Sequence, residues 1–529
     1  MGKNFMTRLL PFVILFLILL IAVRYCQYSA RKAELQVNDH KWDKLLLILE
    51  QIDKNYVDTI DYEAVIEHTL PALMSNLDPH SVYLPPQELK RADESLEGNF
   101  SGIGIEFNVP DDTATVINVV AGGPSERAGL LSGDKIVKVD GENIAGIRMN
   151  QDSIVARLKG PQGSVVNIEV KRDNLKELLP FSITRDKIPV NSLDVALMLN
   201  DTVGYMKLSR FARTSHEEFA EAAEKLRSEG LKTLIFDLRD NAGGYLDQAL
   251  LLANEFLGQD DLIVYMEGLH RKRSDFHADG KGKMQDVKLY VVINEGSASS
   301  SEIFAGAIQD NDRGTIVGRR SYGKGLVQEP IYFTDKSGIR LTVARFYTPT
   351  GRSIQKPYSE NYRYDILERY EHGEMMEADS MKRNDSLKYV TPKGKIVYGG
   401  GGIIPDIFVP LDTSGVTDYL IDVNRKSLQV KYSAKLADRY RQQLRKIGTM
   451  DDLQELIGRI DIERDFRNYA AANGVPMPGA AEWRKSEEII VTQIAGLFGR
   501  YSKLDDIAFY SYLLQIDNAI DAINEDNEK

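Results

Sequence analysis

Four serines lie within five positions of the stretch GSASSSEIF: Ser297, Ser299, Ser300 and Ser301. The preceding run LYVVIN predicts a buried strand and SSEIFAGAIQD predicts a helix, so the serines fall in the turn between them. Such a turn exposes a side chain at the edge of an α/β sheet, and the helix start offers unpaired N–H groups that stabilise an oxyanion. One interpretation is a serine nucleophile. The other is helix capping, which we favour for Ser300 and Ser301.

A nucleophilic serine needs a group that accepts its proton. Lys324 lies between two glycines in RRSYGKGLVQEP, and burial of a lysine lowers its pKa toward the range of a general base. Gln328, four residues later, is able to hydrogen-bond to a neutral amine and orient it. A lysine in a glycine turn is usually just exposed, so this motif alone is weak. The histidines are predicted to be solvated, because they occupy helical or polar contexts: His40, His68, His80, His216, His270, His277 and His372.

These residues require a scaffold that holds strand ends together. From about Pro180 to Pro410, strand-like runs such as VGYMKLSRF, KTLIFDLRDN and VKLYVVIN alternate with helices predicted over residues 216–228, 245–257 and 301–310. This alternation predicts an α/β core with buried, largely parallel strands.

A small β domain is predicted before this core, between Gly98 and Arg172. Short β-type runs and glycine-rich turns occur in an order that resembles a PDZ domain: a Gly-Ile-Gly-Ile stretch, PSERAGL and GDKIVKVDG. The resemblance implies that backbone amides of the first stretch hold the carboxylate of a peptide terminus while the following strand pairs with the peptide. By itself, this stretch could be only the start of a strand. Its residues are Gly102, Ile103, Gly104 and Ile105.

The N-terminus has the layout of an export signal or membrane anchor, because Lys3 and Arg8 precede an apolar run from Leu9 to Val23. No small-x-small cleavage site follows, so we favour an uncleaved anchor over a cleaved peptide. A lipoprotein site at Cys26 is disfavoured, because Arg24 and Tyr25 precede it.

Two further segments are predicted to be helical. Apolar residues between Lys41 and Leu77 recur at helical spacing and predict two amphipathic helices, which pack on the rest of the chain or on a second copy. From Thr417 onward the chain is predicted to be mostly helical and charged, without recognisable chemistry.

Composition excludes several classes of protein. The 529 residues are enough for about three to four domains. A net charge of −12 argues against a nucleic-acid binder, since no concentrated basic face is evident. The single cysteine allows neither an intrachain disulfide nor a cysteine metal site.

Taken together, GSASSSEIFAGAIQD, YGKGLVQ and LRDNAGG resemble the carboxyl-terminal processing proteases, the serine peptidases of family S41. LDPHSVYL, GRSIQKPY and GGGGIIPDI extend the resemblance over residues 40–410. It implies that Ser299 is the nucleophile, Lys324 the base and Gln328 its partner. It also implies an oxyanion hole made of the amide of Ser300 and, in LRDNAGG, Gly244. Alanine is more usual at Ser300, but only its amide is needed, so little consequence is expected.

The resulting fold class is multidomain α/β with a crotonase-like protease core. The expected regions are an anchor over 1–33, a helical region over 34–95, a PDZ domain over 96–176, the S41 core over 177–416 and a helical extension over 417–529.

The expected function is exported endopeptidase activity by a Ser-Lys dyad, with no metal or cofactor, on proteins or peptides with accessible C-termini. The catalytic body is expected on the exported side of the cell membrane, with a homo-oligomer as an open possibility. One alternative is a PDZ scaffold with an inactive core. Another is an acyl-CoA enzyme, for which the sequence offers no nucleotide site.

Overall fold

A computed structural model describes residues 15–25, 43–109, 112–120, 122–172, 175–359, 361–381 and 383–528. The chain divides into two compact units, Met1–Asn76 and Leu77–Lys529. The first unit contains a helix over residues 15–25, α2 (Asp43–Asn55) and α3 (Tyr62–Ser75). Helices α2 and α3 confirm the two helices predicted between Lys41 and Leu77.

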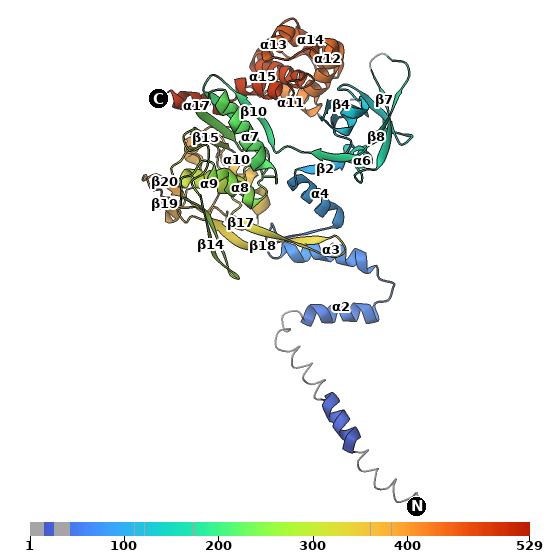
Figure 1. Cartoon of the computed structure of the whole chain (residues 1–529), viewed down its shortest axis with the longest axis vertical. Helices are drawn as coiled ribbons and strands as arrows, with labels where there is room; N and C mark the ends of the chain where they lie inside the picture. The colour runs from blue at the N-terminus through green and yellow to red at the C-terminus, as the bar shows by residue number, and fades with distance from the viewer. Residues whose placement is uncertain are drawn as a thin grey trace, which may run out of the picture. The chain divides into compact units, whose positions relative to one another are not determined.

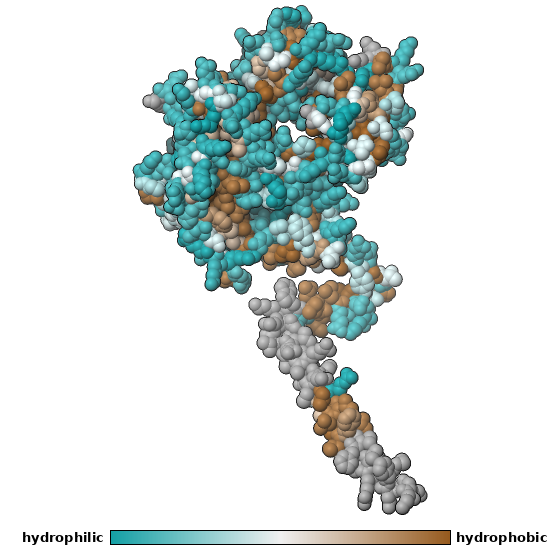
Figure 2. Space-filling model, in the orientation of Figure 1, coloured by the Kyte–Doolittle hydropathy of each residue, from teal (hydrophilic) through white to brown (hydrophobic). Residues whose placement is uncertain are grey.

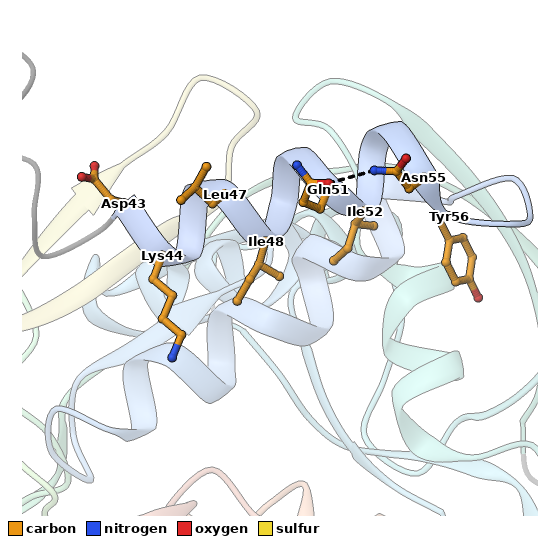
Figure 3. A pocket seen from close by; sticks show the side chains of 8 residues that line it. All are labelled: Asp43, Lys44, Leu47, Ile48, Gln51, Ile52, Asn55 and Tyr56. Atoms are coloured by element: carbon orange, nitrogen blue, oxygen red, sulfur yellow. Dashed lines mark hydrogen bonds between the residues drawn. The ribbon is translucent and has the colours of Figure 1, made fainter. Parts of the chain in front are cut away.

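Apolar side chains are exposed on the helices of the first unit. The helix over residues 15–25 forms a hydrophobic segment of the surface in Figure 2. α2 buries none of its residues, and Leu47, Ile48 and Ile52 project from it in Figure 3. Across the described ranges, no helix is both long and apolar enough to cross a membrane. The first part of the predicted anchor, from Leu9, and Cys26 lie outside the described residues.

An antiparallel sheet forms in the PDZ-like region of the second unit (Figure 1). Its strand order is β3-β4-β5-β7-β8, with β6 paired to β5. Ile136, Val166 and Ile168 belong to its buried core. Among the described strands, β3 pairs only with β4, so it is an edge strand of this sheet. The elements are β3 (Ile105–Asn108), β4 (Ala114–Val119), α5 (Pro124–Ala128), β5 (Lys135–Val139), β6 (Glu142–Asn143), α6 (Gln151–Leu158), β7 (Val165–Lys171) and β8 (Leu179–Thr184).

A six-stranded sheet forms the centre of the α/β core, in the order β10-β11-β12-β15-β16-β21. Strand β10 is antiparallel to β11, whereas the other neighbours are parallel, which confirms the predicted, largely parallel core. The strands are β10 (Leu193–Met198), β11 (Val203–Leu208), β12 (Thr233–Asp237), β15 (Lys288–Ile293), β16 (Thr315–Gly318) and β21 (Ile407–Phe408).

Both faces of this sheet are covered, as expected for buried parallel strands. Leu234, Phe236 and Val291 belong to the core on the face packed by α7 (Ser215–Ser228), α8 (Leu246–Asn254) and α9 (Ser300–Asp310). The alternating residues Ile235 and Val292 belong to a second core, which residues from the end of the chain complete. These are Leu514, Ala519, Ile520 and Ile523, from the short 3-10 helix η5 (Leu514–Ile516) and α17 (Asn518–Asn527).

A second sheet lies beside the first and brings an N-terminal strand into the core. Strand β18 (Gly338–Tyr347) pairs with β1 (Val82–Leu84), β13 (Leu262–Gly268) and β17 (Leu326–Tyr332), and β13 pairs with β14 (Arg271–His277). The segment that precedes β1 also contacts β17, because the carbonyl of His80 accepts a hydrogen bond from Gln328 of that strand. The other small elements are α4 (Pro86–Leu96), β2 (Asn99–Gly102) with its partner β9 (Asp186–Pro189), α10 (Asp365–Glu371), and the paired β19 (Lys388–Val390) and β20 (Ile396–Tyr398).

The predicted helical extension is present and has its own hydrophobic core, which includes Tyr432, Phe466 and Phe498. It contacts the PDZ-like sheet: Lys135 pairs with Asp438 at 3.2 Å, and Arg441 donates to the carbonyl of Gly133 at 2.9 Å. The extension therefore touches both the PDZ-like sheet and the α/β core. Its helices are α11 (Asp418–Arg425), α12 (Leu428–Leu444), α13 (Met450–Gly458), α14 (Ile462–Ala472), α15 (Ala480–Gly499), α16 (Asp506–Leu513) and α17.

Candidate active site

Three consecutive parallel strands end at the same edge of the central sheet. β12 leads into the loop of residues 238–245, β15 into the serine turn of residues 294–299, and β16 into residues 319–325 around Lys324. The strand order therefore places the predicted oxyanion glycine, nucleophile and base on adjacent loops. This edge is where open α/β sheets place their ligand sites.

Ser299 sits in a strained backbone conformation between β15 and α9. Its φ is 54° and its ψ is −112°, values that a residue with a side chain rarely adopts. The turn is held by the N–H of Ala298, which donates to the carbonyl of Asn241 at 2.9 Å. Strained residues that the surrounding structure fixes in place are typical of functional turns.

The other three serines bind the loop of residues 238–245. Ser297 Oγ donates to the carbonyl of Leu238 at 2.7 Å, Ser300 Oγ to that of Gly244 at 3.0 Å, and Ser301 Oγ to that of Asn241 at 2.8 Å. The capping interpretation of Ser300 and Ser301 is therefore wrong: their hydroxyls satisfy carbonyl groups of a neighbouring loop instead of N–H groups of their own helix.

Two glycines allow that loop to approach the serine turn. Gly243 has φ 99°, and a Cβ there would lie 2.8 Å from Ser299 Cβ and 2.9 Å from Ser300 N. Gly244 has φ 151°, and a Cβ there would lie 2.1 Å from the carbonyl oxygen of Phe211. Among the described residues, the N–H groups of Gly244 and Ser300 find no acceptor, whereas that of Gly243 donates to Asn241. The two N–H groups named in the sequence prediction are thus available to a ligand.

A buried carboxylate that the sequence reasoning missed joins the serine turn to the lysine loop. Glu302 is 1% exposed, and its Oε2 accepts from the N–H of Ser299 at 2.9 Å and of Lys324 at 2.8 Å. Its Oε1 accepts from Gly323 N at 2.7 Å and Ser321 Oγ at 2.5 Å. Burial raises the pKa of Glu302, and these hydrogen bonds oppose the shift. The spacing Ser-x-x-Glu, a capping-box pattern, was the available signal.

The environment of Lys324 favours its neutral amine. Burial lowers the pKa of Lys324, and the positive charge of Arg340 adds to the shift, against the opposing charges of Glu302 and Asp78. The flanking glycines permit close packing, as expected: a Cβ at Gly325 would lie 2.9 Å from the backbone N of Gln355. Within the described residues no hydrogen bond joins Ser299 Oγ to Lys324 Nζ; such contacts are often long until substrate binds.

His80 lies at this site, so its predicted solvation is wrong. Its carbonyl accepts from Gln328 Nε2 at 2.5 Å, and its ring nitrogen Nε2 lies 2.6 Å from the Tyr362 hydroxyl. Burial and the nearby Lys324 lower the pKa of His80 to about 4, so the ring is neutral at physiological pH. His216 is half-buried as well and pairs with Glu255 at 2.8 Å. Neither position was evident from the sequence, because each depends on contacts with distant residues.

The predicted peptide-binding stretch forms the loop between β2 and β3. The carbonyls of Ile103 and Gly104 accept from Ser125 N and Val120 N, each at 3.1 Å. Their N–H groups find no acceptor among the described residues. Gly102 ends β2 and Ile105 begins β3, the edge strand.

Comparisons with known proteins find matches for both the α/β core and the PDZ-like region. The model of peptidase family S41 matches residues 202–362, and the PDZ domain model matches residues 101–182. The carboxy-terminal-processing protease of Bartonella bacilliformis is 36% identical over 338 residues, 60% of this chain and 76% of that protein. The carboxy-terminal processing protease CtpA of Bacillus subtilis is 31% identical over 319 residues, 60% of this chain and 67% of that one. The solved photosystem II D1 C-terminal processing protease is 25% identical, with 69% of this chain and 86% of that chain covered and a TM-score of 0.36.

Proposed function

Because the chain belongs to the carboxy-terminal processing proteases of peptidase family S41, we propose that it cleaves proteins by acyl transfer to Ser299, with Lys324 as the general base. One observation carries the proposal: a single oxygen of the buried Glu302 accepts from the backbone N–H of both Ser299 and Lys324. This carboxylate fixes the backbones that carry nucleophile and base relative to each other.

In the proposed reaction, the neutral amine of Lys324 takes the proton of Ser299 as Oγ attacks the scissile carbonyl carbon. The N–H groups of Ser300 and Gly244 stabilise the oxyanion. The ammonium of Lys324 then protonates the leaving amine, and a water activated by the same lysine releases the acyl group. The lowered pKa of Lys324 supports this role. Gln328 donates through Nε2 to His80, which leaves Oε1 as an acceptor for the amine.

Mass spectrometry of a protein substrate pool tests this assignment. The wild-type protein is expected to generate new termini, and Ser299→Ala and Lys324→Ala are each expected to abolish them without unfolding the protein. The two losses should not add, because nucleophile and base act as a unit. Gln328→Ala should retain some activity. Cleavage by the Lys324→Ala protein would refute the dyad, and peptide binding without any wild-type cleavage would favour a scaffold.

The PDZ domain is proposed to engage the C-terminus of the substrate through the loop of residues 102–105 and the edge strand β3. The PDZ domain acts as a gate if the peptide binds one arrangement of the PDZ domain and the core more tightly than another. Otherwise it is a passive tether that only raises the local concentration of substrate. An uncleavable peptide with a free C-terminus distinguishes the two. A gate predicts faster cleavage of a second substrate, whereas a tether predicts competition alone.

The proposal also covers the cellular location of the protein. The apolar segment that begins at Leu9 is proposed to place the catalytic body on the exported side, as an anchor in the cell membrane. Recovery of the full-length protein in membrane fractions is the expected result. A soluble form that begins near Arg31 would show cleavage of the segment instead. Self-association through α2 and α3 stays a prediction.

A further inference from the structure

We propose that Asp517, which precedes the last helix, is a positioning residue for the oxyanion loop and acts through Arg239. The inference rests on the proposed function, because it assigns Asp517 to the loop that ends at Gly244. The resemblance from which the site residues were inferred ends near residue 410, so it assigns no role to this position.

The contact between the two side chains is bidentate. Arg239 Nη1 donates to Asp517 Oδ1 at 3.1 Å, and Nη2 donates to Oδ2 at 2.6 Å. The side chains are 22% and 14% exposed, so the pair is largely shielded from water. A planar guanidinium with two parallel hydrogen bonds to one carboxylate is fixed in orientation as well as in position.

The adjacent edge of the guanidinium, Nε with Nη2, is held by Asp237, the last residue of β12. Arg239 Nε donates to both oxygens of Asp237, at 3.1 and 2.9 Å, and Nη2 donates to Oδ2 at 2.6 Å. Asp237 is fully buried and also accepts from the Tyr205 hydroxyl at 2.7 Å. Arg239 therefore bridges a carboxylate at the strand end and a carboxylate from the C-terminal segment.

The backbone of Arg239 begins the loop that carries the oxyanion glycine. Its carbonyl accepts from Lys207 Nζ at 3.0 Å. The next residue, Asp240, has φ 61° and exchanges two hydrogen bonds of 2.9 Å with Asn294 in the serine turn. Gly244 follows four residues later. An anchored Arg239 therefore fixes one end of the loop against both the strand and the serine turn.

Asp517 is itself held rigidly. It caps α17, since its Oδ1 accepts from Ala519 N at 3.0 Å. Ile520 and Ile523 of that helix are buried against the central sheet. The packing of α17 thus determines where the carboxylate of Asp517 stands, and the ion pair transmits this placement to the loop.

Asp517→Asn tests the proposal in the full-length protein, because asparagine keeps the shape and the capping oxygen but removes the charge. Asp526→Asn is the matched control: Asp526 lies on the same helix, accepts from the Tyr290 hydroxyl at 2.8 Å and is not bonded to the loop. We expect Asp517→Asn to lower kcat about 10-fold with KM unchanged, since small misplacements of catalytic groups cost rate rather than binding. Asp517→Glu should recover part of kcat, and the control should retain the wild-type kcat.

Hydrogen exchange measured by mass spectrometry supplies a readout independent of activity. Asp517→Asn should speed exchange in peptides that span residues 239–245, and Asp526→Asn should not. Equal kcat for the two variants, or unchanged exchange in that loop, overturns the proposal. If the wild-type protein shows no Ser299-dependent cleavage, the proposed function fails, and the exchange data alone decide whether Asp517 orders the loop.

Discussion

The hydroxyl of Ser300 donates a 3.0 Å hydrogen bond to the carbonyl oxygen of Gly244. The two residues whose N–H groups form the proposed oxyanion hole are therefore joined directly. The sequence analysis expected little consequence from a serine at this position. The structure gives the hydroxyl a contact that an alanine side chain lacks.

Ser300→Ala is expected to lower kcat about 5-fold, because the N–H remains but loses a bond worth about 1 kcal/mol in holding the loop. Steady-state kinetics on one peptide substrate measure the effect. KM should not change. A kcat equal to that of the wild-type protein would show that the other contacts of the loop suffice.

Glu302→Gln is expected to reduce kcat by about 100-fold or more, because an amide side chain cannot accept from all of the N–H groups that converge on this carboxylate. The melting temperature should fall as well, since a buried donor loses its partner. Glu218→Gln is the control, because Glu218 accepts from Ser192 N at 2.7 Å and Leu193 N at 2.9 Å. The control should lose stability and keep its activity; equal kcat in both variants would contradict the prediction.

The rate of cleavage should rise with pH, because the proposed base is the neutral amine of Lys324. The folded protein lowers the pKa of this lysine below its usual 10.5. The folded state therefore binds fewer protons than the unfolded chain, and the contribution of Lys324 to stability grows as pH rises toward 10.5. Profiles of kcat/KM and of the free energy of unfolding against pH measure both effects.

Lys324→Met should abolish this pH dependence of the free energy of unfolding. The variant should also be more stable than the wild-type protein at neutral pH, because it buries no charge. Lys281→Met is the control, because this side chain is 84% exposed. A pH profile of unfolding that is the same for wild type and Lys324→Met would refute the assignment of a buried, neutral amine.

Contact between the C-terminal extension and the PDZ domain should weaken as pH rises. Burial, with the carboxylates of Asp506 and Glu106, raises the pKa of Asp505 from 3.8 to about 7, and Arg500 opposes the shift. A carboxyl group with a raised pKa contributes stability below pH 3.8, and that contribution is lost as pH rises to about 7. The side chain accepts from Asn118 Nδ2 of β4 at 2.6 Å, so this loss acts on the contact between the two domains.

Asp505→Asn should flatten this dependence, because the amide stays neutral throughout. Melting temperatures between pH 4 and pH 8 compare the variant with wild type, and Asp521→Asn on α17 serves as the control. Parallel curves for Asp505→Asn and wild type would count against the prediction.

The sequence predicted the parts of the site that depend on local order. Runs such as LYVVIN followed by SSEIFAGAIQD specify strand, turn and helix by themselves, and they place Ser299 correctly at a strand end. Residues that act through distant contacts were missed. His80 reaches Gln328 only because β1 pairs with β18, and Asp517 reaches Arg239 only because α17 packs on the sheet. The role of the Ser300 hydroxyl was predicted wrongly for the same reason: it donates to the carbonyl of Gly244 on another loop instead of capping its own helix.

The cover that Leu514, Ile520 and Ile523 place on the central sheet has a consequence for the timing of activity. During synthesis, the strands that lead to Ser299 and Lys324 emerge long before these residues, and one face of the sheet is then still exposed to water. The free energy of burying that face becomes available only when α17 arrives. A chain that has not yet formed α17 therefore leaves this face of the sheet uncovered, and we expect its cleavage activity to be lower than that of the full-length protein.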